Sequence, residues 1–462
     1  MYKEVTCAQA DLRDASEAPA LIDEALRQCL LQSRPVYIEL PMNMVKTKVS
    51  SSRLVEPICI SPTPNDELVE NAAVDDILRV MQAAEQPAII VDGWTATYGV
   101  TEETDILVRG TRFPTFSTVF GKSIVQENYP NYYGVYAGHS GEPAMMAWVQ
   151  NCDLVIRMAP LYSDYNTFFF TAVTKPTVTV DIHGDAVSVC GQNEYKNLHI
   201  KSLLIKLLAR LDNTTITDIY GHSKILKNPP PKNHDSTIKI SAEGGRMTQA
   251  VFWKRVSQYF QSGDIILAET GTAGVGALDF ILPPLTKLIT SSIWLSIGYM
   301  LGACQGVAMA KHDMRHGFSS SRLSGRTILF EGDGSLQMTV QAISDIIRNR
   351  LDVTIFVINN DGYTIERVIH GMTEDYNWIQ PWQYCEAARF FGAPKNDPAY
   401  HIFAKRAATW AELADVLDDE HMRSGKGLNI VEVILHKEDA PVPMKRSFER
   451  QNSGNHQKAK SK

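Results

Sequence analysis

Two short polar loops, each placed directly after an apolar strand, constrain the fold of this chain more than any other feature. Residues 327–331 predict a buried strand that runs into Gly332-Asp333-Gly334-Ser335. A helical repeat of apolar residues follows, and a second strand over 353–359 ends in Asn359-Asn360-Asp361-Gly362. A strand, a helix and another strand in this order predict neighbouring parallel strands. Both loops then lie at the carboxyl ends of these strands, where open α/β sheets bind ligands.

The residue types in these two loops suit a magnesium–diphosphate site. Asp333 and Asn360 offer the hard oxygen ligands that Mg²⁺ prefers, and a backbone carbonyl near Gly362 would add a third. Gly334 and Ser335 open a helix whose free amides favour an anion, and glycine permits close approach of the backbone. Either loop alone is also an ordinary strand-to-helix turn. The two loops together, separated by one helix and one strand, are a specific signal.

A GDG triplet followed, one helix and one strand later, by paired asparagines resembles the fingerprint of thiamine-diphosphate enzymes. The continuation over 360–371 is similar to the pyruvate decarboxylase and indolepyruvate decarboxylase branch, as are residues 34–37, 268–272 and 294–298. This resemblance covers residues 15–440. It implies an α/β fold of parallel sheets with flanking helices, in the thiamine-diphosphate-enzyme architecture with an incomplete first domain.

Composition shifts place the boundaries of the domains that the resemblance implies. The predicted parts are a C-terminal remnant of a pyrimidine-binding domain (1–47), a linker (48–70), a central α/β domain (71–212), a second linker (213–245), a diphosphate-binding domain (246–440) and a flexible tail (441–462). Within the first part, 20–32 and 36–40 predict one helix and one strand. Since these two cannot bury each other's apolar faces, the first part is interpreted as the end of a domain.

The resemblance also assigns residues to the cofactor and the metal. The implied Mg²⁺ ligands are Asp333, Asn360 and the Gly362 carbonyl, and the implied cofactor-binding residues are Thr270, Gly271, Thr272, Leu295, Ile297, Gly334, Ser335, Asn360, Gly362, Thr364 and Ile365. Ile297 would hold the cofactor in its bent shape, and the Leu295 carbonyl would accept from its amino group. Similar enzymes usually carry glycine at the place of Leu295.

By the same resemblance, Glu366 is the catalytic acid–base residue. A positioned carboxyl can relay the proton that completes the aldehyde after a 2-keto acid loses CO₂. A glutamate in the first turn of a helix is also favoured by the helix dipole alone, so the residue type does not decide between the two interpretations. The surrounding motif favours the catalytic one.

The implied activity is that of a carbon–carbon lyase, which decarboxylates a 2-keto acid, pyruvate first, with thiamine diphosphate and Mg²⁺. The cofactor of such enzymes lies between subunits, which implies a homodimer or homotetramer. Their pyrimidine domain also supplies a glutamate and a His-His pair, but the first histidine of this sequence is His139. We therefore expect an N-terminally truncated chain with impaired activity alone. The alternative is a non-catalytic subunit or paralogue that joins a full-length decarboxylase.

The charge and the cysteines of the sequence indicate which partners, metals and cellular compartments to expect. Lys and Arg number 45 against 52 Asp and Glu, a net charge of −7 that argues against nucleic acid and anionic membranes as partners. Seven scattered cysteines predict reduced thiols in the cytoplasm, and none has zinc-site spacing with histidine. The uncharged stretch Leu288–Ala310 resembles a membrane span. Its polar residues favour a buried helix instead, with glycines four apart packed against a neighbour.

Two further patterns leave alternatives open. The strand endings Asp92-Gly93 and His183-Gly184 hint at a nucleotide site in the central domain. No G-x-G-x-x-G accompanies them, which disfavours a dinucleotide-dependent oxidoreductase, and we expect no FAD there. Phe168, Phe169 and Phe170 either line a substrate pocket or fill the core. The side chain of the substrate, from the methyl of pyruvate to an indole or phenyl ring, therefore stays open.

Overall fold

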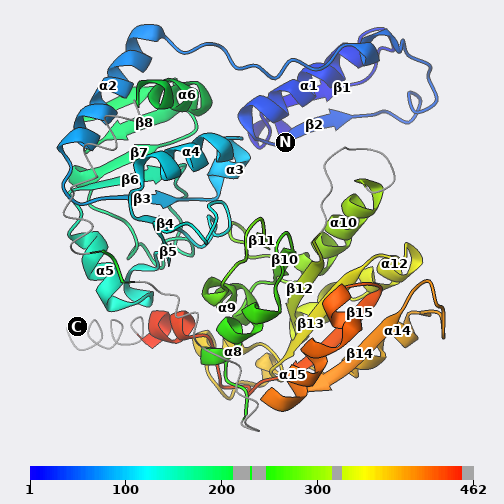
Figure 1. Ribbon diagram of the computed structural model, residues 1–462. Helices are drawn as coiled ribbons and strands as arrows, with labels where there is room; N and C mark the ends of the chain where they lie inside the picture. The colour runs from blue at the N-terminus through cyan, green and yellow to red at the C-terminus, as the bar shows by residue number, and fades with distance from the viewer. Residues whose placement is uncertain (212–228, 232–245, 315–324, 450–462) are drawn as a thin grey trace, which may run out of the picture.

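The computed structural model describes residues 1–211, 229–231, 246–314 and 325–449. In this part of the chain the strands form three sheets of two, seven and six strands, which follow one another along the sequence. Figure 1 shows them as three bodies with helices packed against them. An α/β fold with largely parallel sheets and flanking helices is thus confirmed. The linker predicted over 213–245 lies outside the described residues, apart from 229–231.

The first body is a single β–α–β unit. Strands β1 (Ala8–Asp11) and β2 (Val36–Glu39) pair in parallel, and α1 (Ala18–Gln32) connects them. The core between helix and sheet is small, and apolar side chains such as Leu30 and Leu40 remain exposed. The sequence predicted the helix and the second strand but missed β1, whose polar residues carry no strand pattern.

The second body is a seven-stranded sheet in the order β5-β4-β3-β6-β7-β8-β9. Its strands are β3 (Pro87–Val91), β4 (Thr115–Ser117), β5 (Tyr132–Val135), β6 (Leu154–Met158), β7 (Thr179–Ile182), β8 (Ala186–Val189) and β9 (Asn193–Lys196). Its helices are α2 (Glu67–Ala83), α3 (Trp94–Thr97), α4 (Thr101–Thr111), α5 (Pro143–Gln150) and α6 (Ile200–Arg210). Strand β8 pairs antiparallel with both β7 and β9. The parallel pairing expected for this sheet is therefore wrong at this edge.

The crevice where the strand order of the second sheet reverses is filled by protein. Asp92 follows β3 at this point, and its carboxylate accepts hydrogen bonds from the Leu161 N–H at 3.0 Å and from Asn166 Nδ2 at 2.7 Å. Open α/β sheets bind nucleotides in such a crevice. Here the loop after β6 occupies it, which gives the Asp92-Gly93 ending a structural explanation as a loop anchor.

The third body is an all-parallel sheet in the order β11-β10-β12-β13-β15-β14. Its strands are β10 (Ile265–Ala268), β11 (Lys287–Thr290), β12 (Thr327–Gly332), β13 (Val353–Asn359), β14 (Ile402–Ala407) and β15 (Leu428–Ile434). Its helices are α8 (Gln249–Val256), α9 (Thr272–Gly276), α10 (Tyr299–Asp313), α11 (Asp333–Thr339), α12 (Ala342–Arg348), α13 (Thr364–His370), α14 (Ala387–Phe390), α15 (Trp410–Asp418) and α16 (Glu420–Ser424). Successive strand residues pack into separate cores on the two faces, which explains the continuous apolar strands.

The uncharged stretch 288–310 is not one helix. It contains the end of β11, a turn and the first part of α10, and Gly298 adopts the left-handed conformation (φ +82°) at the turn. A Cβ added at Gly302 or Gly306 would meet no heavy atom within 4 Å, so the expected close packing at these glycines is wrong. Among the described residues, no helix is long and apolar enough to cross a membrane.

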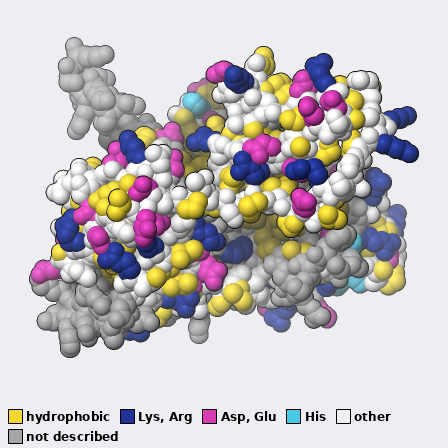
Figure 2. Space-filling model, turned by 90° about the horizontal axis from the view of Figure 1, so that it is seen from above, with side chains coloured by type: hydrophobic (Ala, Val, Ile, Leu, Met, Phe, Trp, Pro, Cys, Tyr) yellow, Lys and Arg dark blue, Asp and Glu magenta, His cyan; other side chains and the backbone are white. Residues whose placement is uncertain are grey.

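Two other expectations need correction. The helix expected after the GDG loop is two short helices, α11 and α12, with a break near Val340. Residues 442–449, expected to begin a flexible tail, are helical, and Met444 is buried. Figure 1 shows this red segment between the second and third bodies. On the face in Figure 2, basic and acidic side chains are interspersed, as the small net charge suggests.

Candidate active site at the carboxyl ends of β10, β12 and β13

The two loops singled out in the sequence meet in the structure. Strands β12 and β13 are parallel neighbours, with Gly332 opposite Ile358, so both loops leave the same edge of the sheet. The Gly362 N–H donates to Asp333 Oδ2 at 2.9 Å and joins the second loop to the first. The predicted juxtaposition of Asp333 with the Asn360–Gly362 loop is therefore observed.

Three oxygen atoms converge between these loops. As oriented, Asn360 turns its side-chain oxygen toward Asp333 Oδ1 at 3.2 Å and toward the Gly362 carbonyl at 2.9 Å, while its nitrogen lies 2.9 Å from Thr364 Oγ1. Three acceptors cannot hydrogen-bond one another. The cluster is satisfied either by turning the amide, so that its nitrogen donates to both oxygens, or by a cation between the three.

The spacing is that of ordinary amide hydrogen bonds and is also compatible with a small divalent cation. Adjacent ligands of an octahedral Mg²⁺ at about 2.1 Å lie roughly 3.0 Å apart, because they span a right angle at the metal. The distances of 2.9 and 3.2 Å bracket that value. Among the described residues, no group of three or more His, Cys, Asp or Glu side chains could hold a metal. The set formed by one carboxylate, one amide and one backbone carbonyl differs from such a group in its ligand types.

Asp333 is the one charged member of the oxygen set. Its side chain is buried, and its carboxylate accepts from the Gly334 N–H and the Gly362 N–H, each at 2.9 Å. Burial raises the pKa of Asp333 to about 7, although these two amides favour the charged form. A carboxylate that costs this much to desolvate is suited to a site that a cation completes.

Arg367 holds the second loop from beneath and was missed in the sequence. Its guanidinium is buried and donates to the Asn360 carbonyl at 3.2 Å and to the Asp361 carbonyl. Its ring-stacking partner is Trp378, with the guanidinium carbon 5.2 Å from the ring centroid. Arg367 lies in the stretch 360–371 that resembles the decarboxylase branch, directly after Glu366. The sequence rules for turns give an arginine at this position no role, so its contacts with the loop were not predicted.

The residues expected around a diphosphate surround the same edge. Thr270, Gly271 and Thr272 follow Glu269, which directly follows β10, and Thr270 Oγ1 is buried with no partner besides the neighbouring Glu269 carboxyl. Gly271 has φ +102°. A Cβ on Gly334 would lie 2.6 Å from the Tyr363 ring, so this ring packs directly against the Gly334 backbone. The Thr270 hydroxyl is a buried donor that an anionic group would satisfy.

The segment before α10 carries Leu295 and Ile297. The backbone of Leu295 adopts a left-handed conformation (φ +52°), which residues other than glycine and asparagine rarely take. Glycine would adopt this backbone conformation without strain, whereas Leu295 adopts it at a cost of about 1–2 kcal/mol. Ile297 is 38% exposed, as a residue that faces an open site would be.

Glu366 and Ile365 lie in the first turn of α13, with Thr364 buried beside them. The Glu366 carboxylate pairs with His370 one turn later at 3.3 Å, and both side chains keep access to solvent. The first-turn position matches both interpretations of Glu366 given by the sequence. The His370 partner was not foreseen, although its spacing of four residues was readable.

An apolar pocket of about 330 Å³ adjoins these residues. It is lined from the third body by residues that include Thr270, Leu295 and Ile365, from the second body by Tyr165, Phe168 and Phe169, and from 442–449 by Met444 and Phe448. The rings of Phe169 and Phe448 meet edge to face with centroids 6.3 Å apart. Phe168 belongs to a buried core cluster and also lines the pocket, and Phe169 lines the pocket, so the core and pocket positions overlap at Phe168.

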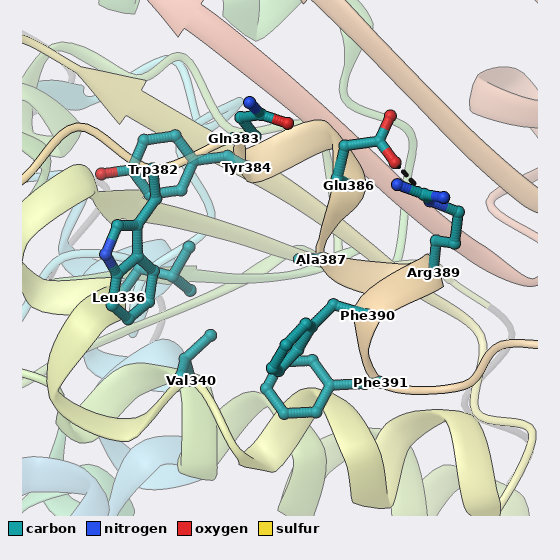
Figure 3. A pocket seen from close by; sticks show the side chains of 10 residues that line it. All are labelled: Leu336, Val340, Trp382, Gln383, Tyr384, Glu386, Ala387, Arg389, Phe390 and Phe391. Atoms are coloured by element: carbon teal, nitrogen blue, oxygen red, sulfur yellow. Dashed lines mark hydrogen bonds and ion pairs between the residues drawn. The ribbon is translucent and has the colours of Figure 1, made fainter.

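A larger cavity of about 580 Å³ lies behind α11 and is drawn in Figure 3. Its lining includes Leu336, Val340, Trp382, Phe390 and Phe391, together with the Glu386–Arg389 pair. The walls carry none of the residues that the resemblance assigns to the cofactor. Size alone therefore does not identify the reactive site.

Comparison with known proteins agrees with this geometry. Residues 74–207 match the family model of the thiamine pyrophosphate enzyme central domain, and 269–425 match that of the C-terminal TPP binding domain. The pyruvate decarboxylase of Aspergillus parasiticus is 40% identical over 445 residues, which cover 96% of this chain and 74% of that protein. The chain belongs to the pyruvate decarboxylase family of thiamine-diphosphate enzymes.

A second relative and a solved structure are also similar to this chain. The pyruvate decarboxylase of Aspergillus fumigatus is 37% identical, again across 96% of this chain and 74% of that protein. The crystal structure of benzoylformate decarboxylase from Polynucleobacter necessarius superposes with a TM-score of 0.67 over 96% of this chain and 78% of that one, at 15% identity, and shows the shared fold. Family membership places the chain among the carboxy-lyases, with thiamine diphosphate as the cofactor.

Proposed function

We propose that the chain performs the non-oxidative decarboxylation of a 2-keto acid, with pyruvate as first substrate, using thiamine diphosphate and Mg²⁺. The observation that carries this proposal is the meeting of Asp333 with the Asn360–Gly362 loop at the carboxyl ends of β12 and β13, which brings together side-chain and carbonyl oxygens of the kind that Mg²⁺ prefers. The pyruvate decarboxylase relatives support the choice of substrate.

In this proposal Asp333, Asn360 and the Gly362 carbonyl would hold Mg²⁺. Thr270, Gly271, Thr272, Gly334 and Ser335 would hold the diphosphate beside it, and the buried Thr270 hydroxyl would donate to it. Thr364, Ile365 and Ile297 would line the rest of the cofactor site, and the Leu295 carbonyl would accept a hydrogen bond from the cofactor. When bound, the cofactor would supply the electron sink that decarboxylation needs.

Glu366 moves the proton in the proposed reaction. Its carboxyl group lies at the mouth of the site in the first turn of α13 and delivers the proton that completes the aldehyde. His370, 3.3 Å away, orients the Glu366 side chain and gives it a route to solvent. The apolar pocket beyond Ile365 accepts the side chain of the substrate and excludes water from the reacting carbon.

The proposal includes a homo-oligomeric arrangement, dimer or tetramer. Large apolar side chains exposed in the third body support it, among them Trp294, Tyr299, Met338 and Phe390, at 85, 57, 57 and 83%. Exposed apolar surface favours contact with another chain. In this proposal this surface receives a pyrimidine-binding domain, and the 462-residue chain, which carries no His-His pair, is impaired when alone.

The first test is an assay of the purified chain with thiamine diphosphate, Mg²⁺ and pyruvate. We expect weak aldehyde release from the chain alone and a clear increase when an intact relative is co-expressed and co-purified with it. Full activity alone would refute the expected impairment. Stable association without any increase in turnover would favour the alternative, a non-catalytic subunit.

Phe169 gives a test of the substrate pocket. Shortening this ring enlarges the pocket next to Phe448, so Phe169→Ala should raise kcat/KM for an aromatic or branched 2-keto acid relative to pyruvate by about 10-fold. Phe170→Ala is the matched control, because Phe170 is exposed and does not line the pocket. Equal ratios in the two variants would place the substrate side chain elsewhere.

A further inference from the structure

Glu269 is a buried carboxyl directly after β10, and no role given above uses it. Its exposed fraction is 0%. Oε1 accepts from the Thr270 N–H at 2.7 Å, and Oε2 accepts from the Met300 N–H at 2.8 Å. The Gly298 N–H also contributes to holding the carboxylate. No cation contributes to this environment in the described part of the chain.

Burying a carboxylate without a neighbouring cation has a high desolvation cost. Removing the charge from water raises the pKa of Glu269, and the surrounding backbone amides oppose that rise. An apolar side chain would pack at this place without the desolvation cost. Glu269 therefore contributes through its charge-assisted hydrogen bonds, which are shorter and stronger than neutral ones.

These bonds join two separate segments of the proposed cofactor site. Thr270 is the first residue of the loop placed against the diphosphate. Gly298 and Met300 belong to the turn and first residues of α10, immediately after Leu295 and Ile297. One carboxylate thus ties the segment at the diphosphate end to the segment that supports the middle of the cofactor.

The same turn is also held from its other side. Thr339 at the end of α11 donates to the Gly298 carbonyl at 2.7 Å. A Cβ on Gly298 would lie 2.6 Å from Met338 Cβ, so α11 packs directly against the turn. With α11 on one side, the carboxylate of Glu269 is the restraint on the other side. Loss of one restraint leaves the turn free to move away from β10.

A second buried carboxyl group, that of Glu331, lies beside Glu269. Glu331 is on β12, where the Glu269 N–H donates to the Phe330 carbonyl at 2.9 Å. Both Glu331 oxygens are buried, and burial together with the neighbouring Glu269 carboxyl raises the pKa of Glu331 well above its usual value. Glu331 offers Glu269 no compensating positive charge, which leaves the backbone amides as the main support of the carboxylate.

We propose that Glu269 is a positioning residue that holds the Leu295–Ile297 segment at a fixed distance from the Thr270–Thr272 loop. This inference rests on the proposed function for the location of the cofactor. It adds that the bent shape of the cofactor is supported by a carboxylate that does not touch it. The two segments then form one preorganised surface before any cofactor arrives.

Glu269→Gln tests the proposal with little change of shape. A glutamine has one acceptor oxygen, so its NH₂ group faces the N–H of either Thr270 or Met300, and one bond is lost. Two quantities are measured: amide hydrogen exchange of the cofactor-free chain, and the Kd for thiamine diphosphate with Mg²⁺ by calorimetry. Glu70→Gln is the control, since Glu70 is a buried glutamate in α2 of the second body.

We expect exchange of the amides around 298–300 to quicken by about 10-fold or more, and the Kd to rise about 10- to 100-fold, as for lost supporting contacts in other sites. The control should show neither change. Unchanged exchange at 298–300, a chain-wide increase in exchange, or an unchanged Kd would each overturn the proposal. Failure of the parent chain to bind thiamine diphosphate would instead count against the proposed function, and the exchange comparison still measures the Glu269 contacts.

Discussion

Asp333→Asn is expected to abolish Mg²⁺-dependent binding of thiamine diphosphate and to lower any turnover by about 10³-fold. Asparagine keeps the shape of the side chain but removes the single formal charge from the proposed ligand set. The remaining amide and carbonyl oxygens bind a strongly hydrated divalent cation poorly. A loss of this size is typical when one essential electrostatic group is removed from a reacting centre. Titration calorimetry with and without Mg²⁺ measures the binding.

The same substitution should remove a pH dependence from the stability of the cofactor-free fold. Burial raises the pKa of Asp333 to about 7, well above its value in an unfolded chain. A carboxyl with a raised pKa binds its proton more tightly when folded, so it lowers stability progressively as pH rises from about 4 to about 7. Asparagine removes this dependence, although it loses one of the two hydrogen bonds that Asp333 accepts from the Gly334 and Gly362 N–H groups. In the presence of a chelator, the Tm of the parent should therefore fall more steeply than that of the variant between pH 5 and pH 8.

Asp361→Asn is the matched control for both measurements. Asp361 lies in the same loop, next to Asn360, but it is not among the three oxygens that converge. Its substitution should change the Kd by no more than a few-fold. Retention of Mg²⁺-dependent binding by Asp333→Asn would show that the metal lies elsewhere, and an equal loss in both variants would point to general damage to the loop.

The meeting of Asp333 and Asn360 was predictable because it depends on short-range rules. Two apolar strands with one helical repeat between them form parallel neighbours, and loops at the same end of such strands are adjacent. Leu295 was recognised as a departure from the resemblance alone, since similar enzymes usually carry glycine at this place. Its left-handed backbone is a conformation that glycine adopts without cost.

The contacts that the sequence did not reveal connect distant segments. Glu269 meets Met300 because α10 begins next to the end of β10, across β11 and a turn. Phe448 meets Phe169 because the last described helix packs on the second body, where Ser140 and Ser447 share a hydrogen bond of 2.7 Å. No periodic pattern carries such information. Hydropathy also misread 288–310, because it does not register the turn at Gly298.

Lys122→Met is expected to destabilise the chain by about 3–5 kcal/mol, the usual cost of breaking a buried ion pair from one side. Lys122 Nζ lies 2.6 Å from Glu127 Oε1, and both side chains are almost wholly inaccessible, at 0 and 3%. The pair also joins the second and third bodies, since Lys122 donates to the Phe280 carbonyl at 2.9 Å and Glu127 accepts from the Leu282 N–H at 3.0 Å.

The expected cost arises because methionine fills the volume of lysine but leaves the Glu127 carboxylate buried without its cation. Guanidinium unfolding followed by circular dichroism measures the loss, and a split into two transitions would show that the two bodies have become uncoupled. Lys445→Met is the control, because its pair with Asp439 at 2.7 Å is partly exposed and should contribute no more than about 1 kcal/mol.

A second variant separates the charge from the packing at this junction. Adding Glu127→Gln to Lys122→Met removes the uncompensated charge while the amide oxygen still accepts from the Leu282 N–H. The double variant should therefore recover most of the lost stability, although two residues are now changed. Additive losses in the double variant would mean that Lys122 acts through its contact with the Phe280 carbonyl, and a loss below about 1 kcal/mol in Lys122→Met would mean that the pair is not buried in solution.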